Sequence, residues 1–150
     1  MNNLSFHITD ITANSIRANA SEIGLSVEEQ DTRIVIRITD NGLGMDAETA
    51  RRVTNPFYTT RTTRKVGLGL PFLIQNAEQT GGSVTLTSEP GKGTEVRAVF
   101  HSDHIDCPPW GDLPGTVALL ITGNPEINVC FEYRSGETGY SISTNEIKEI

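Results

Sequence analysis

Hydrophobic residues recur along this chain with two periods, one helical and one strictly alternating, and the two periods divide it into elements. The first stripe has helical spacing and consists of Leu4, Ile8, Ile11, Ser15 and Ala18. This stripe predicts a helix over residues 6–20. Apolar residues then alternate with polar ones over 22–28 and over 33–38, which predicts two strands joined by a turn at Gln30-Asp31-Thr32.

The middle of the chain continues with shorter elements. Residues 46–53 predict a short helix, with Asp46 as its N-cap. Residues 54–66 have no periodicity and are rich in Thr and basic side chains, which predicts a mobile loop. A further helix is expected over 70–80, and Gly81-Gly82 would end it. Two more alternating runs predict strands, at 84–86 and 96–100.

The order of these elements indicates the fold class. It runs helix, two strands, helix, loop, helix and two strands over residues 1–101. We therefore expect an α/β (α+β) fold, a two-layer sandwich with helices on one face of a mixed β-sheet. Residues 102–115 contain Pro108, Pro109 and Pro114 and predict a linker.

Residues 116–150 predict a C-terminal extension that packs on this domain. The apolar run 116–122 favours a helix, because Asp112 is a candidate cap and Gly123 a candidate stop. Residues 127–134 and 139–143 predict a hairpin around Ser135-Gly136, and 144–150 the start of a last helix.

Composition and charge exclude several classes of protein. The chain has 12 basic and 19 acidic residues, a net charge of -7, which argues against nucleic acid as a general partner. No apolar run is long enough for a membrane span, and the first ten residues lack the features of a signal peptide. Cys107 and Cys130 show neither metal-site spacing nor a disulfide framework. We therefore expect a cytoplasmic protein.

The charge is unevenly distributed. Residues 51–65 hold five basic side chains and no acid, whereas residues 102–150 hold two bases and eight acids. A basic run is usually a solvated surface, but beside glycines that open a helix it also attracts phosphate. The acidic extension is the expected contact for a protein partner.

Three polar side chains share one face of the first predicted helix: Asp10, Asn14 and Arg17. Asn supplies a neutral oxygen to Mg²⁺, Arg binds phosphate, and Asp orients or deprotonates a nucleophile. A solvated helix edge is the alternative interpretation of these residues taken alone.

Two glycine segments carry further candidates. Asp40-Asn-Gly-Leu-Gly-Met45 places a carboxylate at a strand end beside glycines, where it would accept a hydrogen bond from an exocyclic amine such as that of adenine. Its alternative is a hairpin turn, for which Asn-Gly is a strong signal. Gly67-Leu-Gly-Leu70 opens a helix and offers N–H groups to an anion. Its alternative is a flexible helix entry.

Together and in this order, these segments resemble the motifs of the Bergerat-fold (GHKL) ATPase superfamily, which includes gyrase B, MutL, Hsp90 and histidine kinases. The resemblance covers roughly residues 4–101. The chain is similar to small stand-alone, histidine-kinase-like ATP-binding proteins. Five segments carry it, namely Asp10–Ser15 (N box), Asp40–Met45 (G1 box), Asn55–Arg61 (start of the ATP lid), Gly67–Leu70 (G2 box) and Gly91–Thr94 (last box).

The resemblance implies roles for individual residues, with ATP and Mg²⁺ as cofactors. Asn14 would ligate Mg²⁺, Asp40 would accept from N6 of adenine, and Thr94 would help to fix the base, often through water. The base pocket would be shaped by Gly42, Gly44 and Met45. The phosphates would meet Arg17, Lys65 and the backbone of Gly67, Leu68, Gly69 and Leu70.

The catalytic position departs from the family pattern. Hydrolytic members carry Glu four residues before the metal-binding Asn, and this chain has the shorter Asp10 there. His7 lies beside the N box and is not a credible phosphoacceptor. The resemblance favours phosphotransfer to a partner protein in trans. The alternatives are an ATPase that acts as a conformational switch and a non-catalytic, ATP-responsive binding module.

Overall fold

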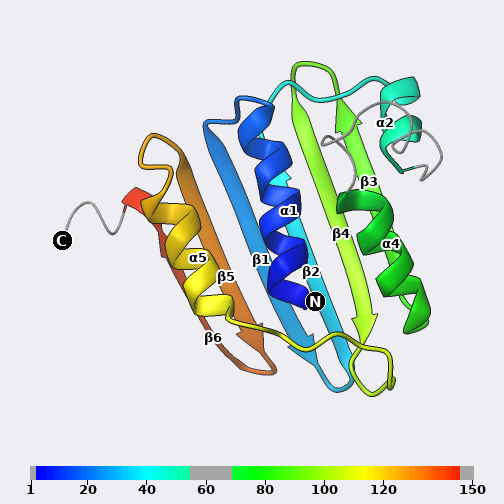
Figure 1. Cartoon of the computed structure of the whole chain (residues 1–150). Helices are drawn as coiled ribbons and strands as arrows, with labels where there is room; N and C mark the ends of the chain where they lie inside the picture. The colour runs from blue at the N-terminus through cyan, green and yellow to red at the C-terminus, as the bar shows by residue number, and fades with distance from the viewer. Residues whose placement is uncertain (1–2, 55–68, 146–150) are drawn as a thin grey trace.

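The structure is a computed structural model that describes residues 3–54 and 69–145 (Figure 1). Its helices are α1 (Leu4–Arg17), α2 (Ala47–Thr54), α4 (Gly69–Gln79) and α5 (Leu113–Thr122). Its strands are β1 (Glu22–Gln30), β2 (Arg33–Asp40), β3 (Ser83–Glu89), β4 (Gly93–His101), β5 (Asn128–Ser135) and β6 (Thr138–Ser143). The predicted order of helices and strands from α1 to β6 is confirmed for the described residues.

The strands form one sheet in the order β3-β4-β2-β1-β5-β6. Neighbouring strands are antiparallel except β1 and β5, which are parallel, so the sheet is mixed. Figure 1 shows the described helices on one face of this sheet. The predicted α/β sandwich is therefore confirmed.

Helix α1 is displaced toward the N-terminus relative to the prediction of 6–20. It begins at Leu4 because the side chain of Asn3 accepts a hydrogen bond (2.7 Å) from a backbone N–H of the first turn. It ends at Arg17 because Asn19 adopts a left-handed conformation, with φ 62°, and turns the chain toward β1.

The core lies between the helices and the covered face of the sheet. The apolar stripe of α1 is buried against alternate residues of β1 and β2, and Phe100 of β4 is fully buried. Burial of each large aliphatic side chain stabilises the fold by roughly 1.5–3 kcal/mol. The alternation in the sequence thus identified the faces that hold α1 against the sheet.

The C-terminal extension continues the sheet. Strand β5 pairs with β1 along its whole length, from Glu22↔Asn128 to Glu29↔Ser135. Helix α5 begins at Leu113, inside the predicted linker, because Asp112 caps it by accepting from the N–H of Gly115 (3.0 Å).

The segment before α5 lies against the start of α1. The carbonyl of Pro109 accepts from the N–H of Leu4 (2.8 Å), and that of Trp110 accepts from the Ser5 hydroxyl (2.6 Å). The N–H of Ser5 also donates to the carbonyl of Trp110 (3.1 Å), so the two backbone bonds satisfy N–H groups that the first turn of a helix leaves without intrahelical partners.

Some predictions lie outside the described residues. They are the mobile loop from residue 55 onward, Lys65, Gly67 and Leu68, and the end of the last predicted helix beyond residue 145. Among the residues that the structure describes, no helix is long and apolar enough to cross a membrane.

Candidate functional site

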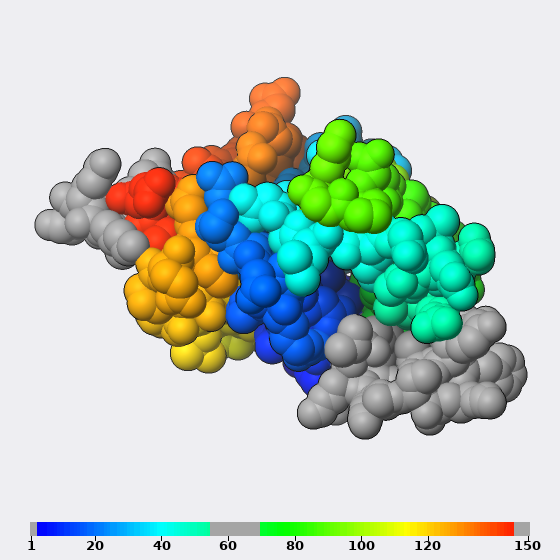
Figure 2. Space-filling model, turned by 90° about the horizontal axis from the view of Figure 1, so that it is seen from above, coloured from blue at the N-terminus to red at the C-terminus, as the bar shows by residue number. Residues whose placement is uncertain are grey.

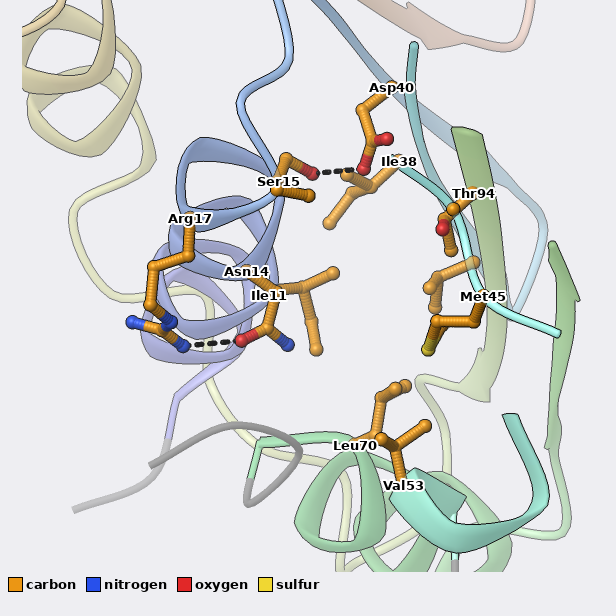
Figure 3. A pocket seen from close by; sticks show the side chains of 13 residues that line it. Ile11, Asn14, Ser15, Arg17, Ile38, Asp40, Met45, Val53, Leu70 and Thr94 are labelled. Atoms are coloured by element: carbon orange, nitrogen blue, oxygen red, sulfur yellow. Dashed lines mark hydrogen bonds between the residues drawn. The ribbon is translucent and has the colours of Figure 1, made fainter. Parts of the chain in front are cut away.

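A cavity of about 200 Å³ lies between α1 and the ends of β2 and β4 (Figure 3). Most of its wall is apolar, and its polar groups come chiefly from α1 and from the strand ends. The lining residues are Ile11, Asn14, Ser15, Arg17, Ala18, Ile38, Asp40, Gly44, Met45, Val53, Leu70, Thr94 and Val96. An apolar cavity with a few oriented polar groups is typical of a small-molecule site.

The Asp40 carboxylate is held in a fixed orientation at this cavity. Its Oδ2 accepts a hydrogen bond from the hydroxyl of Ser15 on α1 (2.6 Å), and its Oδ1 accepts from the backbone N–H of Gly42 (2.9 Å). An ionised carboxylate has about four acceptor positions, so these two bonds leave lone pairs for a ligand. The site is therefore suited to a ligand that donates a hydrogen bond, such as an exocyclic amine.

The loop after β2 depends on glycines because backbone segments approach it closely. Gly44 has φ 73°, and a Cβ at this position would lie 1.9 Å from the carbonyl oxygen of Glu89. The N–H of Leu43 donates to the carbonyl of Ala18 (2.9 Å), and the carbonyl of Leu43 accepts from the N–H of Gly91 (2.7 Å). Figure 2 shows this loop and α2 (cyan to teal) beside the β3–β4 turn (green). Backbone hydrogen bonds thus fix the loop to the residue after α1 on one side and to the β3–β4 turn on the other.

Ser88 joins two walls of the cavity without lining it. Its hydroxyl accepts from the backbone N–H of Met45 (2.9 Å) and lies 2.8 Å from the hydroxyl of Thr94. Met45 and Thr94 both face the cavity (Figure 3). The end of β3 therefore positions groups that a ligand would contact.

The polar edge of α1 forms the opposite wall. A guanidinium nitrogen of Arg17 donates to Oδ1 of Asn14 (2.5 Å), and both residues line the cavity. Asp10, one turn earlier, is half-buried and does not line it. Burial raises the pKa of the Asp10 carboxyl above its usual value, and the charge of Arg17 offsets part of this rise.

Comparison with known proteins agrees with this geometry. Residues 3–104 match the family described as histidine kinase-, DNA gyrase B-, and HSP90-like ATPase. The chain belongs to this family. Its resemblance to the Bergerat-fold superfamily is thereby confirmed, and the chain carries a histidine-kinase-like ATP-binding domain.

The similar proteins include two kinases of Bacillus subtilis. The chain is 29% identical to the sensor histidine kinase YxdK over 65% of its own length and 32% of the kinase. It is 30% identical to sporulation kinase C over 66% of its own length and 23% of the kinase. The chain thus spans about a third or less of these relatives.

A solved structure of this fold is also similar. It is the N-terminal domain of a DNA repair protein, with a TM-score of 0.59 and 18% sequence identity, and the match covers 95% of this chain and 52% of that one. At this identity the likeness concerns the fold alone.

Few of the described side chains at this site could bind Mg²⁺ directly. No group of three or more His, Cys, Asp or Glu side chains among the described residues could hold a metal ion. Mg²⁺ bound with a nucleotide needs few protein ligands, because phosphates and waters supply most of its six oxygens. Asn14 lines the cavity and its carboxamide oxygen, which accepts from Arg17, fits such a role once the side chain shares or exchanges that bond.

The structure brings most of the predicted site residues together. The cavity lining includes Asn14, Arg17, Asp40, Gly44, Met45, Leu70 and Thr94. Gly42 contacts Asp40 instead of lining the cavity, and Gly69 is the first residue of α4. Their functional roles stay predictions.

Two serines were not predicted as site residues. Ser15 stands on the apolar stripe of α1, and a polar residue on such a stripe is a signal for a buried hydrogen bond. Ser88 has no such local signal, because its partners come from the loop after β2 and from β4.

Proposed function

We propose that the cavity binds Mg-ATP and that the domain transfers the γ-phosphate to a partner protein in trans. In this proposal the adenine lies against Asp40 and Thr94, and the phosphates extend toward Asn14 and Arg17. Lys65 and the segment Gly67–Leu70, predicted from the sequence, complete the phosphate site. Binding of a metal-nucleotide complex would explain why one wall carries the carboxamide of Asn14, which suits a metal ion, beside the guanidinium of Arg17, which suits a phosphate.

The observation that carries the proposal is the oriented carboxylate of Asp40. Hydrogen bonds from α1 and from the loop after β2 restrain both of its oxygens before any ligand arrives. Because the carboxylate is already oriented, it accepts a hydrogen bond from the adenine amine without losing further side-chain freedom. A base with a carbonyl oxygen in place of the amine would bring that oxygen against the lone pairs of the carboxylate.

The polar edge of α1 suits phosphoryl transfer. The bond between the γ-phosphorus and the bridging oxygen breaks, a nucleophile on the partner bonds to phosphorus, and ADP leaves. Asn14 would hold Mg²⁺, and Arg17 would neutralise phosphate charge. Asp10 lies one turn before Asn14, and its carboxylate would accept the proton of the attacking group.

Kinship with histidine kinases supports phosphotransfer over simple hydrolysis. Both Bacillus relatives are kinases by name, and residues 3–104 of this chain match the histidine kinase-like ATPase family. The acidic C-terminal extension is the proposed contact surface for the partner.

Calorimetry of ATP binding tests the adenine site. Asp40→Asn should weaken binding by about 2 kcal/mol, roughly thirtyfold, because an amide replaces a charged acceptor. Asp103→Asn makes the same change at an exposed position after β4 and should leave ATP affinity unchanged. Equal ATP affinities of Asp40→Asn and the wild type would refute the adenine assignment.

Incubation with ATP labelled at the γ-phosphate tests the transfer. The protein alone should retain no label, whereas addition of a cell extract should give a labelled protein that depends on this chain and on Asp40. Release of labelled phosphate at the same rate with and without extract would identify a hydrolase instead.

A further inference from the structure

The hydroxyl of Ser88 takes part in three contacts at once. It accepts from the backbone N–H of Met45 (2.9 Å), it donates to the carbonyl oxygen of Gly93 (3.0 Å), and it meets the hydroxyl of Thr94 (2.8 Å). Ser88 is half-buried on β3 and lies opposite Thr94 in the sheet register. Ser88 therefore lies next to Thr94, a residue of the cavity wall, without lining the cavity itself.

Only one assignment of hydrogens satisfies all three contacts. A carbonyl oxygen has no hydrogen, so the single hydroxyl hydrogen of Ser88 must serve Gly93. The N–H of Met45 supplies the hydrogen of its own bond. The hydrogen between Ser88 and Thr94 must then come from Thr94, which leaves Thr94 only lone pairs to offer to the cavity.

The polar groups next to Thr94 in the cavity wall likewise act as hydrogen-bond acceptors toward a ligand. The hydroxyl hydrogen of Ser15 is used on Asp40, and Asp40 accepts on both of its oxygens. The wall formed by Ser15, Asp40 and Thr94 thus has its hydroxyl hydrogens directed to protein atoms, and it presents acceptors to a ligand. Such a wall favours a base with an exocyclic amine and repels one with a carbonyl oxygen at that position.

We propose that Ser88 is a positioning residue that determines base selectivity by holding the hydroxyl hydrogen of Thr94 away from the cavity. The inference rests on the proposed function, because it concerns the base of the nucleotide bound there. Removal of the Ser88 hydroxyl frees the hydrogen of Thr94, which then rotates and donates to a carbonyl oxygen in the cavity. A side chain outside the cavity thereby controls which base the cavity accepts.

The comparison of ATP with inosine triphosphate measures this effect, because inosine carries a carbonyl oxygen where adenine carries its amine. In Ser88→Ala, the ratio of ATP affinity to inosine triphosphate affinity should fall about tenfold, the equivalent of one hydrogen bond. Ser88→Thr keeps the hydroxyl and should retain the wild-type ratio. Ser83→Ala makes the same change at the other end of β3, opposite Val99, and should also retain it.

Both affinities are measured by calorimetry on the full chain, and thermal unfolding checks that each variant is folded. If Ser88→Ala does not fold, Ser88→Cys takes its place, since a thiol forms only weak hydrogen bonds. A tenfold fall confined to the Ser88 variants that lose the hydroxyl supports the proposal. A ratio within twofold of wild type overturns it while leaving ATP binding intact, and a wild-type chain that binds neither nucleotide overturns the proposed function as well.

Discussion

The buried His7 makes the stability of this protein dependent on pH. Its side chain is 1% exposed, packs beside Phe72 with ring centroids 5.5 Å apart, and accepts at Nε2 from the amide of Asn76 (2.7 Å). The Nδ1 atom then carries the hydrogen and has no partner among the described residues. Burial lowers the pKa of His7 from 6.5 to about 4, because a charged imidazole would lose its hydration there.

The sign and size of the effect follow from this lowered pKa. Between pH 6.5 and pH 4 the unfolded chain binds a proton at His7 that the folded chain does not, so stability falls as the pH falls. A pKa lower by about 2.5 corresponds to a loss of about 3 kcal/mol. The contribution is fully retained above pH 6.5 and fully lost below about pH 4.

Urea unfolding at a series of pH values tests this expectation. His7→Gln keeps an amide for Asn76 but does not titrate, so the difference in unfolding free energy between wild type and variant should change by about 3 kcal/mol between pH 7 and pH 4. Parallel curves for wild type and His7→Gln would refute the burial of a neutral imidazole.

Two further substitutions test the loop after β2 and the polar edge of α1. Gly44→Ala should reduce the unfolding free energy by at least about 2 kcal/mol more than Gly91→Ala, since both glycines have positive φ but only the first Cβ would strike Glu89. Equal losses in urea unfolding would contradict the close contact. Asp10→Asn should leave ATP affinity within about twofold and abolish labelled-phosphate transfer, if its carboxylate is the base. Transfer that survives would remove Asp10 from the mechanism.

Prediction from the sequence was most reliable where the signal is local. The helical stripe of Leu4, Ile8 and Ile11 identified α1, because side chains three and four apart share one helix face. Its ends were wrong by two or three residues, because they depend on the cap at Asn3 and the left-handed Asn19. The spacing of the glycines likewise identified the loop after β2, but it did not predict the contact of this loop with the β3–β4 turn.

The candidate site was predicted in part for the same reason. Asn14 and Arg17 share a helix face and were grouped from their spacing, and Asp40 was singled out by the glycines that follow it. That these residues line one cavity follows from the pairing of β2 with β4, in which Asp40 lies opposite Thr94. Asp10 was grouped with them by spacing, yet it lies outside the lining.

The sequence by itself determined the order of the elements, the buried faces of α1, β1 and β2, and the family motifs, because these depend on neighbours within one turn of helix or two residues of strand. Only the tertiary structure decided that β5 lies beside β1, so that the acidic extension continues the sheet. It alone also showed the hydrogen bond from the Ser15 hydroxyl to Asp40 and the hydrogen bond between the hydroxyls of Ser88 and Thr94. Such pairings join residues distant in the chain, and a strand's register is chosen by long-range packing.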